Sequence, residues 1–154
     1  MKKICFFAGH SKLFDKEQIY QKLLSAIENL IVSESVAEFW VGNYGDFDRL
    51  CAGAVRKLKE KYPGICLNLI IPYLTKEINE YKEKYYSDFD CILMADIPLN
   101  TPKKFQISKC NEYAVNTADF LVCFVDRCFG GAAKTLEYAK NKHGITILNL
   151  AEEK

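Results

Sequence analysis

The chain has 154 residues, of which 49% are apolar and 27% are charged, and its formal net charge is +1. This length suits one core, so residues 1–154 are predicted to form a single domain. The near-neutral charge argues against a nucleic-acid or acidic-membrane partner, and no apolar run reaches the roughly 18 residues that cross a bilayer.

Strand patterns and helix patterns alternate from one end of the chain to the other. Short apolar runs predict strands at residues 3–8, 36–41, 66–71, 91–94, 118–125 and 145–150. Apolar residues at helical spacing predict helices at residues 15–31, 46–62, 75–86, 104–117 and 132–142. Asp15 is positioned to cap the first helix, with Gln18 as its capping-box partner. The alternation predicts an α/β protein, a three-layer Rossmann-like fold with a mostly parallel sheet of about six strands.

The cysteines and histidines argue against a metal centre. There are seven cysteines, an odd number without a CxxC pair, and the histidines are His10 and His143. Four of the cysteines fall in predicted strands, where cysteine acts as a small apolar residue: Cys5, Cys66, Cys91 and Cys123. We therefore expect no disulfide framework, no metal and a reducing, cytoplasmic location. The glycines form no GxGxxG dinucleotide fingerprint, and no cofactor is expected.

The turn after the first predicted strand is a candidate binding loop. In parallel α/β sheets, ligands lie beyond the carboxyl ends of the strands. The sequence there reads Ala8-Gly9-His10-Ser11. Gly9 permits a tight backbone turn, and His10 and Ser11 can donate hydrogen bonds to a ligand. The alternative interpretation is an ordinary turn that carries a polar surface histidine.

A second glycine-containing turn follows the second predicted strand. Gly42 and Gly45 lie three residues apart at a helix start, where backbone N–H groups can form a nest for an anion. Asp46 is a candidate ligand residue, or simply a residue suited to a helix N-terminus. Asp48 lies near the same helix end, and its carboxylate can accept hydrogen bonds from sugar hydroxyls or only interact with the helix dipole. Both interpretations of the two aspartates stay open.

The strongest binding signal follows the fifth predicted strand. Gly130 and Gly131 lie between that strand and a helix, where backbone N–H groups and the positive end of the helix dipole can meet a phosphate. Lys134 and Thr135 can contact the phosphate from the first helical turn, and Glu137 is placed to reach a ribose. Alternatively, the glycines only permit a tight strand-to-helix turn. Because three such turns meet at one edge of a parallel sheet, they predict a phosphorylated or nucleotide-like ligand.

Four segments that span nearly the whole chain carry a family resemblance. They are Ala8-Gly9-His10-Ser11, Gly42-Asn-Tyr-Gly45-Asp-Phe-Asp48, Lys109-Cys-Asn111-Glu112 with the following Ala118-Asp119, and Gly130-Gly131-Ala-Ala-Lys-Thr135-Leu-Glu137. Together they resemble the SLOG superfamily of Rossmann-like proteins, which is related to the LOG phosphoribohydrolases and the DprA-type proteins. The resemblance is to an uncharacterised bacterial branch of single small domains. It implies that Asn111 contacts the ligand.

The chain departs from the LOG signature Pro-Gly-Gly-x-Gly-Thr-x-x-Glu at positions that bear on catalysis. Ala133 occupies the position of the third glycine in the signature, and Lys134 occupies the position of the threonine. The loop at 126–129, between the strand and the glycine pair, is longer than in the LOG pattern. Cys110 stands where LOG enzymes carry an arginine, and a thiol cannot supply that bidentate cation. Lys109 or Arg127 can substitute as the cation, although neither stands at the matching position. The resemblance therefore implies ligand binding more directly than catalysis.

Two functions are predicted from these residues. The first is binding of a nucleotide or related phosphorylated small molecule, as in a sensor domain, with the phosphate on the N–H groups from Gly130 through Ala132 to Lys134. The second is the LOG activity, in which the base is cleaved from a nucleoside 5′-monophosphate, with Glu137 as the acid/base or as the residue that orients water.

The sequence also bears on two kinds of macromolecular partner, DNA and a second copy of the chain. DNA binding, as in the DprA relatives, is opposed by the near-neutral charge and the lack of a basic run. A homodimer is implied by the LOG resemblance. Tyr81, Tyr85 and Tyr86 would suit an interface, or would simply pack on the sheet.

Overall fold

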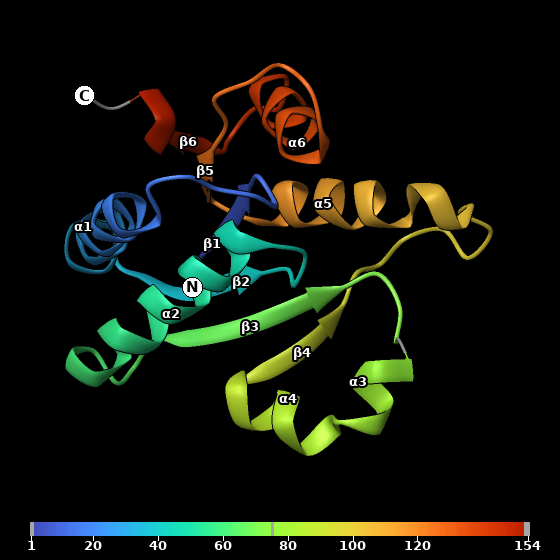
Figure 1. Cartoon of the computed structure of the whole chain (residues 1–154), viewed down its shortest axis with the longest axis horizontal. Helices are drawn as coiled ribbons and strands as arrows, with labels where there is room; N and C mark the ends of the chain where they lie inside the picture. Colours follow the sequence, from blue (N-terminus) through green and yellow to red (C-terminus); the bar gives the residue numbers. More distant parts are fainter. Residues whose placement is uncertain (1, 75, 153–154) are drawn as a thin grey trace.

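The computed structural model describes residues 2–74 and 76–152, and its strands form one sheet (Figure 1). Every strand pair is parallel, and the strand order is β4-β3-β2-β1-β5-β6. The strands are β1 Lys3–Gly9, β2 Val36–Val41, β3 Cys66–Ile71, β4 Cys91–Met94, β5 Phe120–Phe124 and β6 Thr146–Asn149. The predicted α/β fold is confirmed, and the sheet is wholly rather than mostly parallel.

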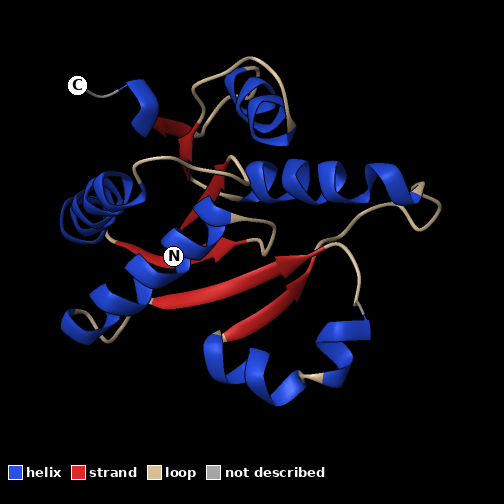
Figure 2. Ribbon diagram, in the orientation of Figure 1, coloured by secondary structure: helices blue, strands red, loops and turns tan. Residues whose placement is uncertain are grey.

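Helices cover both faces of the sheet (Figure 2). They are α1 Lys16–Glu34, α2 Asp46–Lys61, α3 Lys76–Glu80, α4 Lys82–Asp88, α5 Gln106–Thr117 and α6 Gly131–Lys140, with short 3₁₀ helices η1 Lys103–Phe105 and η2 Leu150–Glu152. Along β1, Cys5 and Phe7 pack in a core with α1 and α2, while Phe6 and Ala8 pack in a second core with α5 and α6. This alternation produces the three layers. Among residues 2–74 and 76–152, no helix has the length and apolar character that a membrane span requires.

The direction of strand addition reverses beside β1. From β1 the chain adds β2, β3 and β4 in turn toward one edge, and α5 then returns it to the other side of β1, where β5 and β6 follow. The loops that leave β1 and β5 consequently lead to helices on opposite faces of the sheet. Ligands of doubly wound sheets bind at such a switch point, so β1 and β5 define where a site is expected.

Two helix predictions are corrected by the structure. Asp15 makes no side-chain cap on α1, and its backbone is left-handed, with φ of 52°. Its carbonyl oxygen instead accepts a hydrogen bond from the Ile19 N–H at 3.1 Å. The segment 75–86 is not one helix, because Tyr81 leaves helical angles and separates α3 from α4. Thr75, the first residue of that prediction, lies outside the described residues.

The edge of the sheet is more open than its apolar sequence predicts. Cys91 lies on the edge strand β4, which has a neighbouring strand on one side only, and it is exposed. Cys66 at the start of β3 is half-buried. Tyr81 and Tyr86 are exposed, whereas Tyr85 packs against the core.

Candidate functional site

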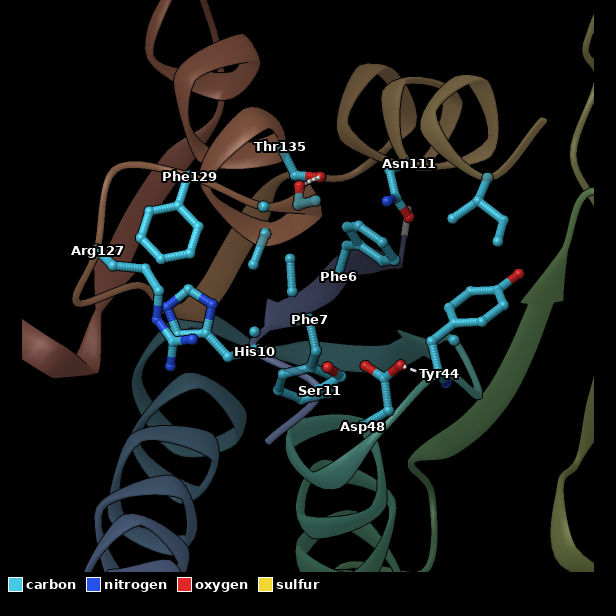
Figure 3. A pocket seen from close by; sticks show the side chains of 17 residues that line it. Phe6, Phe7, His10, Ser11, Tyr44, Asp48, Asn111, Arg127, Phe129 and Thr135 are labelled. Atoms are coloured by element: carbon cyan, nitrogen blue, oxygen red, sulfur yellow. Dashed lines mark hydrogen bonds between the residues drawn. The ribbon is translucent and has the colours of Figure 1, made fainter. Parts of the chain in front are cut away.

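A pocket of about 270 Å³ lies at the carboxyl ends of β1 and β2 and beside the start of α6 (Figure 3). Its walls come from the turn after β1, the turn after β2, the start of α5 and the loop between β5 and α6. The predicted site residues that line it are Gly9, His10, Ser11, Gly42, Asp48, Asn111, Gly130, Gly131, Ala132 and Thr135. The structure therefore brings the three glycine-containing turns together. The predicted site residues that do not line it are Gly45, Asp46, Lys134 and Glu137.

Two glycines allow the turn after β1 to approach α2. A Cβ added to Gly9 would lie 2.2 Å from the Phe47 ring, and one added to Gly45 would lie 2.4 Å from the Ser11 Cα. The Asp46 N–H donates a 2.8 Å hydrogen bond to the Ser11 carbonyl at the same contact. These glycines shape the pocket floor through close packing, and Gly45 does so without facing the pocket.

Asp46 is occupied by the loop that precedes α1. Its carboxylate accepts a hydrogen bond from the Leu13 N–H at 3.0 Å and forms ion pairs with Arg49 at 2.8 Å and Lys16 at 3.4 Å. The hydrogen bond from Leu13, followed by the one from Arg49, lowers the pKa of Asp46 to about 2. This carboxylate anchors the loop between β1 and α1 to the start of α2.

Asp48, two residues later, faces the pocket. Its Oδ2 accepts a 2.9 Å hydrogen bond from the Tyr44 N–H, and no other described residue bonds its side chain. Gly42 leaves room for this corner, since a Cβ there would lie 3.0 Å from the Tyr44 ring and 3.2 Å from Oδ2. Burial raises the pKa of Asp48 to about 6, although the Tyr44 N–H and Arg49 act in the opposite direction.

His10 is a buried imidazole in the pocket wall. Its side chain is 6% exposed, and its Nε2 accepts a 3.2 Å hydrogen bond from the Asp126 N–H. Burial and the nearby Arg127 charge lower the pKa of His10, against the opposing pull of the Asp126 carboxylate. The same Nε2 lies 3.1 Å from an Asp126 carboxylate oxygen, so the imidazole is tied to the start of the loop between β5 and α6.

The start of α6 supplies unpaired backbone donors. Gly130 has φ of 97°, a conformation that glycine adopts readily, and it precedes the helix without a side-chain cap. The Lys134 N–H is bonded to the Gly130 carbonyl at 3.1 Å, and the three N–H groups before it have no acceptor within the helix. Thr135 donates its hydroxyl proton to the Gly131 carbonyl at 2.9 Å, so its oxygen is left as an acceptor.

Sequence reasoning missed several residues of the pocket wall. Tyr44 and Ile107 line it on the side of β2 and α5, and Phe129 lines it beside α6. Arg127, which the sequence offered only as a substitute cation, also lines the pocket. Its guanidinium lies 5.8 Å from the centre of the Phe129 ring and 3.3 Å from an Asp126 carboxylate oxygen. An arginine and an aromatic residue in a loop just before a glycine pair were the available signal.

Glu137 lies away from the pocket. It is exposed and lines a separate depression of about 620 Å³, together with Lys134. Successive helix residues are rotated by about 100°, so Glu137 lies nearly opposite the face that carries Gly131, Ala132 and Thr135. Across residues 2–74 and 76–152, no group of His, Cys, Asp or Glu side chains is arranged to hold a metal ion.

The comparisons with known proteins show the fold and no nearer relationship. No family model matches the chain, and no curated protein matches it. The X-ray structure of DNA processing protein A (DprA) from Streptococcus pneumoniae is similar, with a TM-score of 0.63 and 13% sequence identity. The match covers 95% of this chain and 49% of that protein, so the chain spans about half the length of DprA. The chain therefore shares the Rossmann-like fold of DprA.

Proposed function

We propose that the protein binds a nucleotide or a related phosphorylated small molecule in the pocket at the carboxyl edge of the sheet. The observation that carries this proposal is the meeting, in one pocket, of the α6 N-terminus, the Arg127 cation and the Asp48 carboxyl group. Helix N-termini and arginine favour phosphate, and carboxylates accept hydrogen bonds from sugar hydroxyls. DprA is described as a DNA processing protein, and a shared fold is consistent with a nucleotide-related ligand at this coarse level.

The pocket suggests a pose for such a ligand. Figure 3 has Arg127 and Phe129 at one end of the cavity and Tyr44 at the other, with Asp48 between them. A phosphate is placed against Arg127 and the start of α6, and a base is placed near Tyr44. A volume of about 270 Å³ is small for a ligand site and favours a mononucleotide over a dinucleotide.

Thermal unfolding with nucleoside monophosphates, and with inorganic phosphate alone, tests the proposal. A ligand at 100 times its dissociation constant adds roughly 2.7 kcal/mol to the unfolding free energy. Arg127→Ala should weaken the shift, while Lys57→Ala should leave it unchanged, because Lys57 is exposed on α2 and does not line the pocket. Failure of every nucleotide to raise the melting temperature at millimolar concentration would contradict the proposal.

A second candidate function is hydrolysis of the N-glycosidic bond of a nucleoside 5′-monophosphate. The observation that favours it is the Asp48 carboxyl group, which faces the pocket with one oxygen unbonded among the described residues. Cys110 supplies no cation for this reaction, because it is 1% exposed, packs in the core under α5, and has a pKa that burial raises to about 12. Release of free base on incubation with the nucleotide tests this function.

We also propose a homodimer. The exposed rings of Tyr81 and Tyr86 are consistent with an interface. Light scattering after gel filtration tests it, and a monomer mass at micromolar concentration would refute it. DNA binding is not expected, because the net charge of the chain is close to zero. A mobility-shift assay at low salt, in which no shift is expected, tests this.

A further inference from the structure

Asp48 is distinguished from the other acidic side chains near this edge of the sheet. Asp46 is engaged by the loop before α1, Asp126 contacts Arg127 and His10, and Glu137 lies on the far side of α6. Among the acidic residues that the structure describes, Asp48 is the one that lines the pocket. Any reaction in this pocket that requires a carboxyl group therefore falls to Asp48.

The Asp48 carboxyl group is held in one orientation. The Tyr44 N–H fixes Oδ2 at 2.9 Å, and Gly42 leaves the space that the carboxylate and the Tyr44 ring occupy. Figure 3 shows the group in the first turn of α2, directed into the cavity. Oδ1 has no bonding partner in the described ranges, and the half-buried side chain lines the pocket, where a ligand or water can bond this oxygen. A fixed oxygen that faces a cavity is suited to accept a proton.

The surroundings of Asp48 raise its proton affinity, which suits a proton acceptor. Burial raises its pKa to about 6, and its titratable neighbours are Tyr44, Arg49 and Cys51. The carboxyl group is then mostly ionised at neutral pH, yet is a stronger base than an exposed aspartate. A general base is most effective when its pKa lies near the working pH.

The proposed pose places the reacting carbon near this oxygen. With the phosphate at the α6 N-terminus and the base near Tyr44, the sugar lies between them and over Asp48. The anomeric carbon joins sugar and base, so it falls on the side of the sugar away from the phosphate. Hydrolysis in this pose requires a water molecule between the carboxyl group and the anomeric carbon.

We propose that Asp48 is the catalytic acid/base of N-glycosidic hydrolysis in this pocket, an inference that rests on the proposed nucleotide site. Water attacks the anomeric carbon while its proton moves to Asp48 Oδ1. The bond from this carbon to the base nitrogen breaks, and its electron pair stays on the base. Asp48 then returns the proton to the departing base, directly or through solvent, so the products are ribose 5-phosphate and free base.

Base release and ligand binding are measured separately to test this assignment. The intact protein and its variants are incubated with the common nucleoside 5′-monophosphates, and free base is quantified by chromatography, with thermal shifts recorded in parallel. Asp48→Asn keeps an acceptor for the Tyr44 N–H and should reduce base release at least about 100-fold, while a smaller thermal shift persists at saturating nucleotide. Glu60→Gln is the matched control on the same helix, because Glu60 is exposed and does not line the pocket. The rate at which the wild type releases free base should increase as pH rises through about 6 and should then level off.

The outcomes separate this inference from the proposal on which it rests. A nucleotide that raises the melting temperature without base release would leave the binding function standing and overturn the catalytic assignment. Release that survives Asp48→Asn but is lost in Glu137→Gln would also overturn it and return the role to Glu137. If no nucleotide shifts the melting temperature and no base appears, both proposals fail together.

Discussion

Replacing Asp48 by asparagine is expected to stabilise the ligand-free protein at neutral pH. Burial raises the pKa of this carboxyl group from 3.8 to about 6, so the folded protein holds the proton more tightly than the unfolded chain. Wild-type stability must then fall as pH rises from about 4 to about 6, and the full cost remains above that range. The difference between the two pKa values corresponds to about 3 kcal/mol of unfolding free energy. Asparagine carries no charge to desolvate and still offers an oxygen to the Tyr44 N–H.

The measurement is urea unfolding of the wild type and Asp48→Asn in reducing buffer. From the two pKa values, the stability advantage of the variant should grow by about 1.4 kcal/mol between about pH 5 and about pH 7.5. Glu60→Gln on the same helix is the control and should change stability by less than about 0.5 kcal/mol at both pH values. A variant whose advantage does not grow with pH, or that is less stable than the wild type at about pH 7.5, would refute the reasoning. The stabilised variant should also bind nucleotide less well, as expected where function keeps a buried charge in place.

Three further predictions concern the frame of the pocket and its cation. Gly9→Ala should cost about 1–3 kcal/mol of unfolding free energy, measured by urea unfolding, because the new Cβ would lie 2.2 Å from the buried Phe47 ring; unchanged stability would show that the ring can yield. Asp46→Asn should flatten the loss of stability in acid. The folded pKa of Asp46 is about 2, so the stabilisation given by its contact with the Leu13 N–H is present above about pH 4 and is lost as pH falls toward 2. An acid unfolding profile identical to that of the wild type would contradict this. Arg127→Ala should weaken nucleotide binding about tenfold or more by calorimetry, and equal affinities would remove the arginine from the site.

Periodicity alone was sufficient to predict the strands and the edge of the sheet at which the pocket lies. Short apolar runs bounded by turn residues predicted every strand, because a buried parallel strand has few residue types open to it. The turns that begin at Gly9, Gly42 and Gly130 follow strands of one parallel sheet, and parallel strands end at the same edge. Their meeting in one pocket is therefore a property of the alternating pattern, and it needs no knowledge of side-chain packing.

The sequence predicted the start of α1 and the break between α3 and α4 less well, because tertiary contacts influence these details. Aspartate is a residue type that commonly caps helices, so Asp15 was predicted as a cap. The loop before α1 is instead held to Asp46 by the Leu13 N–H, and Asp15 precedes the helix in a left-handed conformation. The charged segment at 75–86 has a helical composition throughout, yet it bends at Tyr81. Contacts between segments far apart in the sequence decide such details, and propensity does not record them.

The sequence by itself determined that this protein is an α/β sheet with glycine-containing turns gathered at one edge. Only the tertiary structure decided which side chains line the pocket at that edge. Asp46 and Asp48 are equivalent candidates in the sequence, but one binds a neighbouring loop and the other faces the pocket. Thr135 and Glu137 both belong to the candidate motif, but they lie on opposite faces of α6. The physical reason is that backbone periodicity is encoded locally, whereas the direction, burial and proton affinity of a side chain depend on neighbours that folding brings together.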